Sequence, residues 1–210
     1  MKFLIFDLDG TLIDSRYCIL NTLNIMSKEY QISFSEEEKK LASKFGINKL
    51  FAKYSLDDDS YNLLQAQFAK IFLLNIKNDT TLYPDILEVL AKLQELYTLV
   101  IYTAKIKKFT LETLELFDLN KYFEAVYFSE SFEEKKPSSK PIVNILKNHN
   151  FTKQDSLIIG DTSSDLNGAK NADVKSCFAS YGYGEELEMK KIGFDYIIKK
   201  PVDLIDLLKK

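Results

Sequence analysis

The chain has 210 residues, of which 46% are hydrophobic and 28% are charged, and its formal net charge is −3. This composition is typical of a folded globular protein of one or two domains. The net negative charge disfavours nucleic-acid binding. No apolar run approaches the roughly 20 residues that span a bilayer. The chain holds one histidine, one arginine and two cysteines, which excludes catalysis by several histidines, a four-cysteine zinc site and a disulfide scaffold.

If the protein is an enzyme, its catalytic groups must therefore be carboxylates, hydroxyls, lysines or a bound metal. The N-terminal apolar run meets Asp7 too early for the core of a signal peptide. Together with two unpaired cysteines, this favours a reducing, cytoplasmic setting. The single histidine, His149, is expected at the surface near the end of a helix.

The chain begins with an apolar run, residues 2–6, that predicts a buried β-strand. From about residue 15 to 78, apolar residues recur at helical spacing and no strand is expected. After Pro84, helices and strands alternate, which indicates a parallel sheet covered on both faces. The expected elements are helices at 84–95, 107–117, 141–148, 164–171 and 202–208, and strands at 97–102, 125–128, 156–159, 174–179 and 194–198.

Two domains follow from this pattern. Residues 1–14 and 80–210 are expected to form an α/β core, a Rossmann-like parallel sheet with helices on both faces. Residues 15–79 are expected to form an all-helical domain inserted after the first strand.

Polar residues collect directly after the predicted strands. Ligands of open α/β sheets bind beyond the carboxyl ends of the strands, so these side chains are expected to share one edge. They are Asp7, Asp9, Thr103, Lys136, Asp161 and Asp165.

This set has a chemical logic. Clustered carboxylates repel one another unless a cation lies between them, and hard oxygen ligands suit Mg²⁺. A cation with Lys136 and Thr103 would accommodate a phosphoryl group, whose transfer depends on positioning and charge neutralisation. A carboxylate can also attack phosphorus and form an aspartyl-phosphate.

These residues and their order along the chain resemble those of the haloacid dehalogenase (HAD) superfamily. The family pattern is a hydrophobic strand followed by DxDGT, then a Ser or Thr after a strand, then a Lys, then GDxxxD. All four motifs occur here in order, over essentially the whole chain, as Asp7–Thr11, Thr103, Lys136 and Gly160–Asp165. Further segments resemble the phosphoglycolate-phosphatase-like branch, whose small helical cap the inserted domain also resembles: Asp9–Ser15, Leu82–Pro84 and Gly182–Gly184.

The resemblance implies roles for the four aspartates. Asp7 would be the nucleophile and a Mg²⁺ ligand. Asp9 would protonate the leaving group and then activate water, while its backbone carbonyl binds the metal. Asp161 would complete the metal site, and Asp165 would ligate the metal or orient its waters and Lys136.

The resemblance also implies a phosphate-binding set. Thr103, the backbone around Ala104 and Gly10 would hold phosphoryl oxygens, and Lys136 would neutralise them. Lys136 precedes a proline, as the lysine of the family pattern does. Lys140 also precedes a proline and is the alternative.

In the helical domain, the segment around Gly46 interrupts the helical pattern. It is either a turn between helices or, by resemblance, a loop that contacts the leaving group and sets specificity. The candidate contacts in this segment are Lys44, Gly46, Asn48 and Lys49. Arg16, at the entry to the helical domain, is either a surface residue or a further contact to a substrate carboxylate or phosphate.

The expected function is a Mg²⁺-dependent phosphatase that acts on a small phosphorylated metabolite such as phosphoglycolate, as a monomer or weak homodimer. A sugar phosphomutase resembling β-phosphoglucomutase would use the same catalytic residues and stays open. A non-enzymatic signalling module that is phosphorylated on Asp7 is the alternative from another class, although such modules are shorter and lack a cap. Neither GxGxxG nor GxxxxGK[ST] occurs, which argues against dinucleotide and nucleoside-triphosphate binding.

Overall fold

The computed structural model describes residues 1–54 and 56–209, except for the side chains of Lys44 and Phe45. The backbone divides into two compact units. One consists of Met1–Ile13 and Leu82–Lys210, and the other of Asp14–Thr81.

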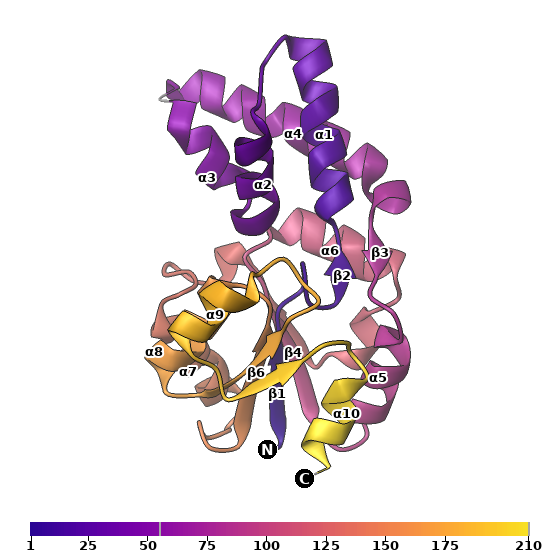
Figure 1. The fold of residues 1–210 in the computed structure, drawn as a ribbon, viewed down its shortest axis with the longest axis vertical. Coiled ribbons are helices and arrows are strands. Elements are labelled where there is room, and N and C mark those ends of the chain that lie inside the picture. Colours follow the sequence, from indigo (N-terminus) through magenta and orange to yellow (C-terminus); the bar gives the residue numbers. More distant parts are fainter. Residues whose placement is uncertain (55, 210) are drawn as a thin grey trace. The chain divides into compact units, whose positions relative to one another are not determined.

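The first unit is built on a six-stranded parallel sheet with the strand order β5-β4-β1-β6-β7-β8 (Figure 1). The central strands are fully buried, as expected for a parallel sheet with both faces covered. The parallel α/β fold expected from the sequence is therefore confirmed. The strands are β1 (Phe3–Phe6), β4 (Thr98–Tyr102), β5 (Ala125–Tyr127), β6 (Ser156–Gly160), β7 (Lys175–Ala179) and β8 (Tyr196–Ile198).

Alternate residues of each strand pack against different helices. Leu4 and Phe6 of β1 share a core with α5 (Ile86–Leu93), α6 (Lys107–Leu116) and α10 (Asp203–Leu208). Phe3 and Ile5 pack with α7 (Ser139–Asn148) and α8 (Ser163–Ala172) on the other face. The sheet is thus a rigid platform whose strand ends are fixed from both sides.

The second unit is helical. Its helix starts carry the expected signals: Ser35 and Glu38 form a capping box, and the Asp57 carboxylate accepts the Ser60 N–H. Buried apolar side chains, among them Leu23 and Phe72, form its interior. Its elements are α1 (Arg16–Tyr30), α2 (Glu36–Phe45), α3 (Ile47–Phe51), η1 (Ala52–Tyr54) and α4 (Asp58–Asp79), and two short strands, β2 (Ile13–Asp14) and β3 (Thr81–Leu82), pair where the units connect.

Three local expectations are corrected. The helix expected from Pro84 begins at Ile86, because Asp85 has a left-handed φ of 63° that a helix cannot include. Helix α9 (Glu186–Ile192) was not predicted. The side chain of His149 is only 9% exposed, and lies against Phe3 while bonding Tyr127 and Glu124.

Among the described residues, no helix combines the length and the apolar character needed to cross a membrane.

Candidate active site

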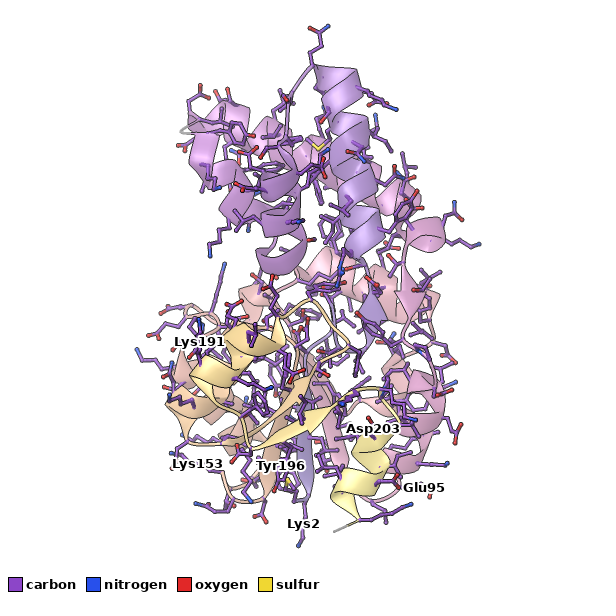
Figure 2. All side chains as sticks on the ribbon, in the orientation of Figure 1. Lys2, Glu95, Lys153, Lys191, Tyr196 and Asp203 are labelled. Carbon is purple, nitrogen blue, oxygen red and sulfur yellow. The ribbon has the colours of Figure 1, made fainter. Side chains whose placement is uncertain are left out.

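The candidate site lies at one edge of the sheet, where the parallel strands end. Asp7 follows β1, Thr103 follows β4 and Asp161 follows β6. All three are buried, with at most 8% of each residue exposed. The exposed Lys2 marks the opposite edge, where the strands begin, and points away from the sheet (Figure 2).

Lys136 joins two of the predicted aspartates. Its Nζ lies 2.7 Å from Oδ1 of Asp7 and 2.6 Å from Oδ1 of Asp165. Its ammonium also lies 4.9 Å from the centre of the Tyr102 ring, within cation–π range. The other carboxylate oxygen of Asp165 accepts the N–H and the hydroxyl of Thr162, which caps α8. Asp165 therefore caps a helix and orients Lys136 at the same time.

Burial and charge shift the pKa values of this group. Burial raises the pKa of Asp7 to about 7; Lys136 opposes this shift, and Asp165 adds to it. Burial disfavours the charged form of Lys136, but the carboxylates of Asp165 and Asp7 outweigh it and raise the pKa of the ammonium. The lysine therefore stays protonated beside a nucleophile candidate that is costly to ionise.

Lys140, the alternative phosphate-binding lysine, lies elsewhere. Its side chain is 73% exposed and pairs with Glu134 at the surface. The side chain of Lys136 is 6% exposed, so among these two lysines only Lys136 lies with the predicted aspartates.

Asp161 is fully buried and held by two hydrogen bonds. Its Oδ1 accepts the Thr11 hydroxyl at 3.2 Å, and its Oδ2 accepts the Tyr183 N–H at 2.7 Å. Gly10 has a left-handed φ of 84°, and a Cβ there would lie 2.1 Å from Oδ2 of Asp161. Only glycine fits, because the turn needs the positive φ and the carboxylate needs the space.

Asp7, Asp161 and Asp165 could together hold a cation. Each offers one carboxylate oxygen, and these oxygens lie within 4.8 Å of one another. Burial, then the charges of Asp165 and Asp7, raise the pKa of Asp161 well above its usual value. Three hard oxygen donors, whose mutual repulsion one ammonium relieves only in part, fit a hard divalent cation.

Asp9 lies on the same edge and forms an ion pair that the sequence analysis missed. Its Oδ1 is 2.7 Å from Nζ of Lys105, and the two side chains are 22% and 7% exposed. The Lys105 N–H donates to Oγ1 of Thr103, so Lys105 also contacts the predicted phosphate-binding threonine. The sequence signal that could have identified Lys105 was its position two residues after Thr103, just beyond the end of a predicted strand.

The two remaining phosphate-binding candidates, Ala104 and Gly10, differ in whether they are free to meet a ligand in the terms the structure gives: exposure for the first and a hydrogen bond within its own turn for the second. Ala104 is exposed in the loop that follows β4. The N–H of Gly10 instead donates to the Ile13 carbonyl at 2.8 Å within its own turn. Gly10 thus makes room for Asp161, and its amide is occupied.

The candidate contacts in the helical unit are described within that unit only. Arg16 is exposed at the start of α1, and Asn48 accepts a hydrogen bond from Gln65. Gly46, with a φ of 82°, separates α2 from α3, and Lys49 is exposed on α3. The side chain of Lys44 lies outside the described residues. A role of these residues in specificity stays a prediction.

Comparison with known proteins agrees with the motifs. The family described as haloacid dehalogenase-like hydrolase matches residues 4–179. A phosphoglycolate phosphatase of Aquifex aeolicus (strain VF5) is 29% identical over 212 residues, covering 99% of this chain and 97% of that protein. The pyrophosphatase PpaX of Halalkalibacterium halodurans is 25% identical, covering 97% and 95%. A haloacid dehalogenase-like hydrolase structure from Streptococcus pneumoniae superposes with a TM-score of 0.86 at 24% identity, covering 99% and 98%.

The chain belongs to the haloacid dehalogenase-like hydrolase family. The enzyme that the motifs predicted is confirmed, since the matching family is one of hydrolases.

Proposed function

We propose that this protein is a Mg²⁺-dependent phosphatase that hydrolyses a small phosphorylated metabolite through an aspartyl-phosphate. The observation that carries the proposal is the buried carboxylate of Asp7 at the end of β1, 2.7 Å from the ammonium of Lys136. A carboxylate in this position can attack phosphorus while a fixed cation neutralises the phosphoryl oxygens. Relatives named as a phosphoglycolate phosphatase and a pyrophosphatase support a small substrate of this kind.

In the first half of the reaction, an oxygen of Asp7 forms a bond to phosphorus. The bond from phosphorus to the leaving-group oxygen breaks, and that oxygen takes a proton from Asp9. The Thr103 hydroxyl and the backbone at Ala104 would bind phosphoryl oxygens, and Lys136 would balance their charge. The product of this half is an aspartyl-phosphate.

In the second half, water attacks the phosphorus of the aspartyl-phosphate. The bond from phosphorus to the Asp7 oxygen breaks, which restores the carboxylate, and Asp9 takes the proton of the attacking water. Phosphate then leaves. Asp9 thus acts as an acid in one half and a base in the other.

Asp7, Asp161 and Asp165, with the backbone carbonyl of Asp9, would hold the Mg²⁺ ion. When bound, the ion would neutralise negative charge in the site and at the transferring phosphoryl group. In this arrangement Asp161 contributes only to the metal site, because Thr11 and Tyr183 hold it in place.

Metal binding is expected to stabilise the fold measurably. Saturating Mg²⁺ should raise the Tm of the protein by roughly 5–10 °C, since it binds the folded site and relieves repulsion among buried carboxylates. Asp161→Asn should abolish this shift, and Asp173→Asn, an exposed residue with a φ of 58° that asparagine tolerates, should retain it. Thermal denaturation with Mg²⁺ and with chelator measures both, and an equal shift in Asp161→Asn would contradict the assignment.

The reaction class is tested with the purified protein, Mg²⁺ and a panel of phosphate esters that includes phosphoglycolate, pyrophosphate and p-nitrophenyl phosphate. We expect many turnovers of phosphate release per enzyme, and none in excess chelator. Isomerisation of glucose 1-phosphate without phosphate release would establish a phosphomutase instead. A single stoichiometric phosphorylation without turnover would establish a signalling module.

A further inference from the structure

Lys105 is a residue at this edge of the sheet to which the proposed reaction gives no role. It pairs with Asp9 at 2.7 Å, and its side chain is 7% exposed. The neighbouring Lys107 and Lys108 are exposed, as is usual for lysine. Burying a lysine side chain costs up to about 2 kcal/mol of rotamer freedom, so its placement against one carboxylate needs an explanation.

The backbone of Lys105 is fixed from both sides of the loop after β4. Its N–H donates to Oγ1 of Thr103, and its carbonyl accepts the N–H of Ser129. Thr103 is in turn fixed, because its own N–H donates to the Tyr127 carbonyl at the end of β5. The ammonium of Lys105 therefore reaches Asp9 from a backbone position that is hydrogen-bonded to the residues after β4 and β5.

The Asp9 side chain is more exposed than those of Asp7 and Asp165. It is 22% exposed, against 11% for Asp7 and 1% for Asp165. A short carboxylate in a turn can adopt several rotamers, and an ion pair with a fixed ammonium selects one of them.

We propose that Lys105 is a positioning residue that holds the Asp9 carboxylate where it takes the proton of the attacking water. The inference rests on the aspartyl-phosphate mechanism proposed above. In that step a bond forms between the water oxygen and phosphorus, the bond to the Asp7 oxygen breaks, and the proton passes to Asp9. Lys105 does not touch the reacting atoms, so its loss slows hydrolysis of the aspartyl-phosphate by letting Asp9 move.

The variant Lys105→Met tests this with p-nitrophenyl phosphate, whose leaving group departs without help from an acid. We expect kcat to fall by about 10- to 100-fold, because misplaced catalytic groups cost rates of this order, and KM to fall with it, so that kcat/KM changes little. The intact mass of the enzyme quenched during turnover should show a large fraction heavier by one phosphoryl group. A purely structural defect would reduce the amount of active enzyme without accumulating this species.

Matched variants complete the test. Lys105→Arg keeps the charge and should recover part of the rate, and Lys105→Gln serves if the methionine variant folds poorly. Lys108→Met, at an exposed position near the same loop, should behave as wild type. Asp9→Asn is the reference that should accumulate phosphorylated enzyme most strongly.

The outcomes separate the inference from the mechanism on which it rests. If Asp9→Asn accumulates phosphorylated enzyme and the Lys105 variants do not, Lys105 has no positioning role and the mechanism stands. A rise in KM with kcat unchanged would make Lys105 a substrate contact and overturn the inference. If Asp9→Asn also accumulates nothing, the aspartyl-phosphate mechanism itself fails.

Discussion

Asp7→Asn is expected to lower phosphate release by about 10⁴-fold or more, because the amide cannot replace the carboxylate as nucleophile. The asparagine oxygen can still accept the hydrogen bond from Lys136, so the surrounding site should keep its geometry. Steady-state release from p-nitrophenyl phosphate measures the loss, and the quenched variant should carry no covalent phosphoryl group. Intact turnover in this variant would exclude Asp7 as the nucleophile.

The same variant is expected to be more stable than the wild type when divalent cations are absent. Burial raises the pKa of Asp7 from 3.8 to about 7, so between these pH values the folded protein binds a proton that the unfolded chain has released. Wild-type stability should therefore fall as pH rises through this window, which Asp7→Asn avoids. Chemical denaturation should show a difference on the order of 3 kcal/mol above about pH 7 and none below about pH 4.

This pairing of lost activity with gained stability is the expected signature of a functional group held in an unfavourable place. A variant as unstable as the wild type at every pH would show that Lys136 compensates fully for the burial of Asp7. Saturating Mg²⁺ should reduce the difference, since a bound cation stabilises the carboxylate that the variant lacks.

The sheet and much of its active edge could be predicted because their signals are local. Short apolar runs between helical segments predicted the parallel strands, and the strand ends then placed Asp7, Thr103 and Asp161 together. Helix boundaries were less accurate: the positive φ of Asp85 delays α5, which no propensity argument at Pro84 anticipates.

The long-range pairings could not be read from the sequence. Lys105 looks like part of a solvated lysine run, and only the folded loop brings its ammonium to Asp9, 96 residues earlier in the chain. His149 was expected at the surface because it ends a helix, but Phe3 and Tyr127 from two strands cover it. Both residues are polar, and their burial depends on partners that tertiary structure supplies.

The sequence alone does not decide whether Lys136 or Lys140 binds the phosphoryl group, and Lys136→Met tests this by its effect on activity. This variant removes the ammonium that contacts both Asp7 and Asp165, so kcat/KM is expected to fall by about 10²- to 10³-fold. Leaving two buried carboxylates without this partner should also lower the free energy of unfolding by roughly 3–5 kcal/mol in the absence of metal. Phosphate-release kinetics and chemical denaturation measure the two effects.

Lys140→Met is the matched control, because the two lysines lie in one segment and each precedes a proline. The Lys140 side chain is 73% exposed and its ion pair with Glu134 is at the surface, so activity should be unchanged and stability should shift by less than about 0.5 kcal/mol. If Lys140→Met lost activity and Lys136→Met kept it, the assignment of Lys136 as the phosphate-binding lysine would be wrong. If both variants behave as expected, two lysines that each precede a proline differ in function because the fold buries Lys136 between two carboxylates and leaves Lys140 exposed.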